Sequence, residues 1–188
     1  PLSLSERQPA FTALESKGIN EHKRIRVAVG EDNPPVAFFD EGGQMRGIIA
    51  DVLTALQLRT GFNFVIQRYS TQRAALESVN AGKADLVAGV TQGDIWRSDL
   101  LTTRTWLYNS WVMVGQAHHA PEAVNPGVLS LDGQSPEEWL RKQNGGQLEK
   151  IDTWRRGLNR ILHGNGEMMA MPLIVANALL ATKEYAAL

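Results

Sequence analysis

The strongest constraint on the fold is a regular alternation of short apolar runs and amphipathic segments in the first half of the chain. The runs 25–29, 63–67 and 85–89 are short and predict strands, and the first of them is rich in β-branched residues. The two segments between them carry apolar residues at helical spacing and end at Gly61 and Gly82, where glycine is favoured after a last helical turn. The order strand, helix, strand, helix, strand predicts a parallel sheet with right-handed crossovers.

The carboxyl ends of these three strands predict where a ligand binds. In open parallel sheets, ligands lie beyond the carboxyl ends of the strands. Here those ends are the segments 30–35, 69–71 and 89–93. We therefore expect a pocket at this edge of the sheet, before any family is considered.

The rest of the chain gives a second, weaker α/β pattern. Ser135 is a predicted helix N-cap, with Glu138 as its capping-box partner. Further along, 148–152 and 167–171 are expected strands, and the apolar face of 154–162 predicts a helix between them.

These patterns divide the chain into three parts. Residues 1–24 are polar and weakly periodic, so we predict a leader or connector with a short helix. Lobe 1 is expected over 25–115 and lobe 2 over 116–188, with Trp139 and Trp154 in the core of lobe 2.

Composition and charge exclude several classes of protein. The 19 basic and 20 acidic residues give a net charge of −1, which argues against a nucleic-acid binder because such proteins carry a basic face. The chain has no cysteine, which excludes disulfides and thiolate metal sites. Its longest apolar stretch, 168–181, is too short to span a bilayer. No cofactor or metal is expected, because His118 and His119 are adjacent and lack the spacing of metal ligands.

Several motifs of the predicted lobe 1 resemble the family-3 periplasmic solute-binding proteins, which are Venus flytrap domains. The resemblance rests on the strand RIRVAV, a Pro-rich loop, a G-x-x-x-D helix start at Gly47 and Asp51, the run ALESVNAGKADLVAGV, and Arg97. It covers about 24–115 well and 127–188 loosely. It implies a two-lobed α/β fold, with mostly parallel sheets flanked by helices, whose lobes hinge over a small ligand.

The resemblance also implies a function. The leader before the first strand looks like the connector of tandem flytrap sensors outside hybrid histidine kinases of the Bvg or Evg type. We expect a periplasmic sensor domain of such a two-component receptor, not itself an enzyme, that reaches the membrane only through flanking segments. A homodimer is an expected arrangement in the full-length receptor. The alternatives are a free binding protein of an ABC transporter, a flytrap dehydratase or lytic-transglycosylase regulatory domain, and a flytrap that binds nothing.

The expected ligand is a small carboxylate or another small anion. Arg97 is the candidate anchor, because a guanidinium pairs bidentately with a carboxylate; the alternative is a surface ion pair. Thr91 and Gln92 could donate to the same carboxylate or be ordinary loop residues. Asp32 could face the ligand or cap a turn, and Tyr69 could stack on a flat ligand or pack in the core.

An α-amino acid is disfavoured as the ligand. In amino-acid-binding relatives, an acidic residue after the lobe 2 strand pairs with the ligand ammonium. The corresponding segment here, 168–177, contains no acidic residue. An unpaired ammonium in a closed cleft is costly, because its charge loses water without gaining a partner.

Two further departures from the family concern continuity. The family has a strand between the SLDG turn and the lobe 2 helix, whereas here Gly133 leads directly to Gln134 and Ser135. The sequence also stops at Leu188, before the return to lobe 1 that flytraps make. We therefore expect missing residues between Gly133 and Gln134 and after Leu188.

Overall fold

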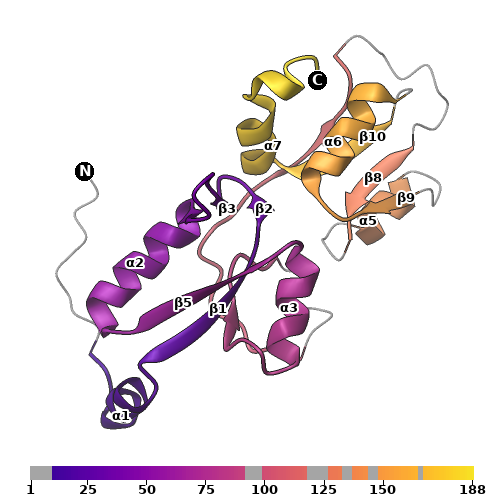
Figure 1. The fold of residues 1–188 in the computed structure, drawn as a ribbon. Coiled ribbons are helices and arrows are strands. Elements are labelled where there is room, and N and C mark those ends of the chain that lie inside the picture. The colour runs from indigo at the N-terminus through magenta and orange to yellow at the C-terminus, as the bar shows by residue number, and fades with distance from the viewer. Residues whose placement is uncertain (1–9, 92–98, 118–126, 133–136, 144–147, 165–166) are drawn as a thin grey trace.

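The computed structural model describes residues 10–91, 99–117, 127–132, 137–143, 148–164 and 167–188. It has two α/β lobes, each with its own sheet and its own hydrophobic core (Figure 1). This confirms the fold class predicted from the sequence.

The sheet of lobe 1 is parallel and has the strand order β5-β1-β6. Its strands are β1 (Arg24–Gly30), β5 (Asn63–Tyr69) and β6 (Leu86–Val87), in the places that the sequence predicted. Helix α2 (Ile48–Thr60) covers one face and α3 (Gln72–Asn80) the other (Figure 1).

The central strand β1 is buried on both faces. Val27 and Val29 pack in the core on the α2 side, whereas Ala28 packs against Ala75 of α3. Successive side chains of a strand point to opposite faces, so this alternation follows from the sequence. The two small alanines allow α3 to lie close to the sheet.

A small antiparallel sheet follows β1, where only a Pro-rich loop was expected from the sequence. It contains β2 (Asp32–Asn33), β3 (Ala37–Phe39) and β4 (Met45–Arg46). The expectation of a loop was wrong for Asp32 and Asn33, because their backbone pairs with Phe38 and Ala37. This pairing places Asp32 at the boundary between the lobes.

The sheet of lobe 2 is mixed and has the order β7-β10-β8-β9. Strands β8 (Val128–Leu131), β9 (Leu148–Ile151) and β10 (Met168–Pro172) are parallel, and β7 (Trp111–Val114) is antiparallel to β10. The second sheet thus begins before residue 116. All four residues of β8 are buried, and the sequence analysis did not predict this strand.

The helices of lobe 2 pack against this sheet. They are α5 (Glu137–Gln143), α6 (Trp154–His163) and α7 (Leu173–Leu180), followed by the 3₁₀ turn η1 (Lys183–Tyr185). The core includes Trp154, as predicted. The same prediction was wrong for Trp139, which is 57% exposed, because the neighbouring Leu140 takes the buried face of this short helix instead.

The leader contains one helix, α1 (Ala13–Glu21). Thr12 and Glu15 form a reciprocal capping box at its start. No residue of α1 is buried, so the helix owes its stability to local interactions rather than to a core.

No helix among the described residues is long and apolar enough to cross a membrane.

Candidate functional site: the interlobe cleft

A cavity of about 20 Å³ lies between the two lobes. From lobe 1 it is lined by Gly30, Asp32, Asn33 and residues 70–72, and from lobe 2 by Leu131 and residues 152–154. These are residues at or just beyond the carboxyl ends of β1 and β5 on one side and of β8 and β9 on the other. The pocket expected at the ends of the first two strands is therefore present.

The third expected end does not line this cavity as far as the structure describes it. Ala88, just after β6, instead accepts a hydrogen bond from Gln72 Nε2 at 3.1 Å. That bond fixes the Gln72 side chain at the wall of the cleft and ties the start of α3 to the end of β6.

Two helices begin at the cleft, one from each lobe. The Thr71 hydroxyl caps α3 by accepting from the Ala74 N–H at 3.1 Å. The Thr153 hydroxyl caps α6 by accepting from the Arg156 N–H at 3.2 Å. Because a helix N-terminus carries a partial positive charge, both lobes present a favourable potential for an anion here.

Polar side chains bridge the two lobes directly. Arg155 Nε of α6 donates to Asp32 Oδ1 of β2 at 3.0 Å. The indole Nε1 of the buried Trp154 donates to Asn33 Oδ1 at 3.3 Å. These contacts join the first turn of α6 to the β2 strand of the other lobe.

A third bridge lies on the α3 side of the cleft. Arg73 of α3 is 2.7 Å from Asp132, the residue that follows β8. Asp132 also pairs with Lys150 at 3.0 Å within lobe 2. The acid is therefore shared between a cation of each lobe.

The electrostatics of the cleft centre on Arg155. Partial burial lowers the pKa of Arg155, but the charge and hydrogen bond of Asp32 oppose this effect, and the pKa is raised overall. The guanidinium is thus a permanent cation at the lobe boundary.

The predicted site residues fall in different places. Asp32 lines the cleft, where it pairs with Arg155. Tyr69 packs on the α3 side of the sheet against the small core of Ala28, Ala75 and Ala84, so stacking on a ligand stays a prediction. Thr91 is partly exposed after β6.

Arg97 and Gln92 lie outside the described residues, so their roles stay predictions. The lobe 2 wall, with Thr153 and Trp154, and the bridging Arg155 were missed. The signal was present, since these residues directly follow the predicted strand 148–152, and the rule of strand carboxyl ends applies to both lobes.

The acidic residues beside β1 and β6 and in β2 are each held by a different arginine. Glu31 pairs with Arg68, Asp32 with Arg155 and Asp85 with Arg26. Three acids that each pair with a different arginine do not form the clustered carboxylates of a dehydratase. Within the described ranges, no group of three or more His, Asp or Glu side chains could hold a metal ion.

Residues 25–160 match the family model of bacterial extracellular solute-binding proteins, family 3. The virulence sensor protein BvgS of Bordetella bronchiseptica is 31% identical over 134 residues, which are 71% of this chain and 11% of BvgS. The sensor protein EvgS of Escherichia coli K12 is 27% identical over 157 residues, which are 77% of this chain and 12% of EvgS. The chain thus spans about a tenth of the length of these relatives.

Solved structures give the same fold. The periplasmic VFT2 domain of Bordetella pertussis BvgS superposes with a TM-score of 0.83 at 23% identity, covering 95% of this chain and 78% of that one. A glycine-to-alanine mutant of arginine-bound ArgBP from T. maritima gives a TM-score of 0.74 at 16% identity, covering 90% of this chain and 82% of that one. Because the family model matches most of this chain, the chain belongs to the bacterial extracellular solute-binding proteins of family 3 and has their Venus flytrap fold.

Proposed function

We propose that this chain is the periplasmic sensor domain of a two-component receptor kinase like BvgS and EvgS, and that it binds a small anionic solute between its lobes. Membership of a solute-binding family and the two sensor relatives support the first part. In this proposal the domain binds the solute and changes shape, and the kinase part of the receptor carries out the catalysis. Homodimerisation in the full-length receptor is part of the same proposal.

The observation that carries the anionic part is the pair of helix N-termini at the cleft. Helices α3 and α6 start on opposite sides of one cavity, and their caps, Thr71 and Thr153, both line it. An anion between them gains from both partial charges when the lobes close, and less when they separate. Only such a difference in affinity between states lets a solute drive closure.

The anchoring residues in this proposal are Arg97, Thr91 and Gln92, with Asp32 at the lobe boundary. The segment 168–177 forms β10 and part of α7 and supplies no acid. An anion without an ammonium group therefore fits the proposal better than an α-amino acid.

A thermal-shift screen of small carboxylates tests the proposal. A solute present at a hundred times its dissociation constant stabilises the folded state by about 2.7 kcal/mol. For a chain of this size that corresponds to a Tm increase of roughly 5 to 10 °C. We expect at least one of acetate, malonate, succinate and citrate to give such a shift at constant ionic strength.

The Arg97→Ala variant should lose the shift, because it removes the proposed anchor. Arg59→Ala is the matched control, since Arg59 is exposed in the last turn of α2 and does not line the cleft. Equal shifts in all three proteins would remove Arg97 from the site. No shift with any carboxylate would contradict the anionic solute.

One observation favours a second candidate, a flytrap that signals without a solute. A cavity of about 20 Å³ has room for about one water molecule, and side chains already bridge the lobes. This candidate predicts that no small molecule stabilises the protein, although the interlobe contacts still control its shape.

A further inference from the structure

One guanidinium of the cleft also contacts the last structural element of the chain. Arg155, in the first turn of α6, pairs with Asp32 of lobe 1 at 3.0 Å. Its Nη1 lies 3.5 Å from Glu184 Oε2 in the 3₁₀ turn η1. The same cation therefore serves a carboxylate of each lobe.

The two carboxylates hold Arg155 unequally. The Asp32 side chain is 19% exposed, whereas that of Glu184 is 52% exposed. Water screens the Glu184 pair more strongly, and its separation is longer, so Asp32 is the dominant partner in this arrangement. Without Asp32, the Arg155 guanidinium would pair with Glu184 alone.

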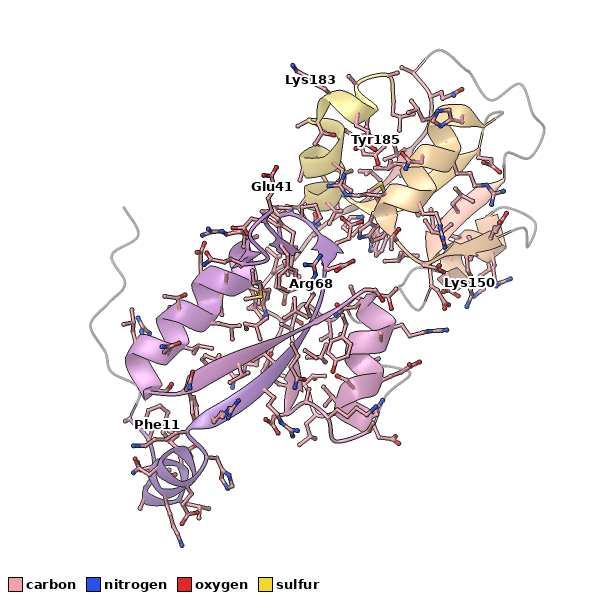
Figure 2. The ribbon with its side chains drawn as sticks, in the orientation of Figure 1. Phe11, Glu41, Arg68, Lys150, Lys183 and Tyr185 are labelled. Atoms are coloured by element: carbon pink, nitrogen blue, oxygen red, sulfur yellow. The ribbon has the colours of Figure 1, made fainter. Side chains whose placement is uncertain are left out.

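The neighbour of Glu184 makes the turn sensitive to such a change. Tyr185 is fully buried, and Figure 2 places it in lobe 2 between α6 and α7. Its hydroxyl lies near Glu184 and Arg155 but makes no hydrogen bond of good geometry among the described residues. Burial raises the pKa of Tyr185, the neighbouring Glu184 adds to that rise, and the nearby Arg155 opposes it. The turn is thus held by apolar packing and by Arg155, and the buried hydroxyl inside it lacks a well-formed hydrogen bond.

We propose that Arg155 couples the separation of the lobes to the turn η1. While Asp32 holds Arg155, Glu184 is weakly paired. When Asp32 withdraws, either because the lobes separate or because a solute anion takes its place, Arg155 pairs more fully with Glu184 and the turn becomes more ordered. The second route rests on the proposed function, whereas the first needs no solute.

Hydrogen exchange of the amides in 182–188 tests the coupling in the absence of any solute. Asp32→Asn removes the competing charge, so exchange should slow by about twofold to fivefold, which is the size expected for a partly exposed ion pair. Asp40→Asn is the matched control, because Asp40 pairs with Arg46 inside lobe 1 and should leave this exchange unchanged.

The decisive comparison repeats the measurement in an Arg155→Gln background. There Asp32→Asn should have no effect on 182–188, because the shared cation is gone. The proposal is overturned if Asp32→Asn leaves the exchange unchanged in the wild-type background, or if its effect persists without Arg155.

A reciprocal variant keeps the proposal testable if Asp32→Asn fails to fold. Glu184→Gln should strengthen the pairing of Asp32 with Arg155. The distribution of distances between spin labels on α3 and α5, measured by pulsed electron resonance, should then become narrower. An unchanged or broader distribution contradicts the proposal. Neither measurement involves a solute. The coupling can therefore fail while carboxylates still bind, and carboxylates can fail to bind while the coupling holds.

Discussion

Replacing Gly47 with alanine should cost far more stability than an ordinary glycine substitution. Gly47 precedes α2 with φ of 102° and ψ of −174°, a conformation that is open almost only to glycine. A Cβ there would lie 2.4 Å from the carbonyl oxygen of Pro35 and 2.8 Å from that of Val36. Those two carbonyls accept hydrogen bonds from Ile48 and Ile49, so they cannot move away freely.

The magnitude follows from three terms. The backbone conformation costs an alanine about 2 kcal/mol, and overpacking against main-chain atoms adds about 1 to 2 kcal/mol. Weakening the two hydrogen bonds that start α2 adds about 1 kcal/mol. We expect Gly47→Ala to lower the free energy of unfolding by about 4 kcal/mol.

Gly61 provides the matched control. It also has a positive φ, of 72°, but a Cβ there would meet no atom within 4 Å. Gly61→Ala should therefore cost only the backbone strain, about 1 to 2 kcal/mol. Urea unfolding of both variants measures the difference, and a Gly47→Ala loss no larger than that of Gly61→Ala would refute the close-approach argument.

Three smaller predictions concern single side chains. Arg26 holds the pKa of Asp85 down at about 2 through side-chain and backbone hydrogen bonds. The pKa of Asp85 in the folded state lies below that in the unfolded state, so this stabilisation is present above about pH 4 and is lost as pH falls towards 2. Asp85→Asn should flatten that part of the plot of unfolding free energy against pH, measured by urea unfolding. An unaltered plot would contradict the assignment. Tyr185→Phe removes a buried hydroxyl that makes no hydrogen bond of good geometry and should leave Tm equal or higher, whereas a marked fall would show that its contacts with Glu184 and Arg155 stabilise the fold. Thr153→Ala should cost about 1 kcal/mol in chemical unfolding, and Thr153→Ser much less, because serine keeps the cap.

The elements of lobe 1 were predictable because their signals are local. The β-branched run of β1, the cap at Thr71 and the glycine that ends α2 each act within a few residues. Strand β8 was missed because four buried residues without alternation are too few to be assigned to a strand by periodicity alone. Trp139 was misplaced because helix α5 is too short to define its buried face from periodicity.

Half of the candidate site was predictable for the same reason. The carboxyl ends of β1 and β5 located the lobe 1 wall, including Asp32. The partner of Asp32 is Arg155, 123 residues away, and no local pattern connects them. Pairing across a cleft depends on how two lobes meet, which periodicity and spacing do not encode.

Spin labels on the two lobes test whether an anionic solute changes the distance between the lobes. The chain has no cysteine, so single cysteines at exposed Glu77 of α3 and Arg141 of α5 can be labelled without background. The distance distribution between them, measured by pulsed electron resonance, should shift when a stabilising carboxylate is added, and should not shift in Arg97→Ala. Identical distributions with and without that carboxylate would contradict a flytrap that responds to an anionic solute.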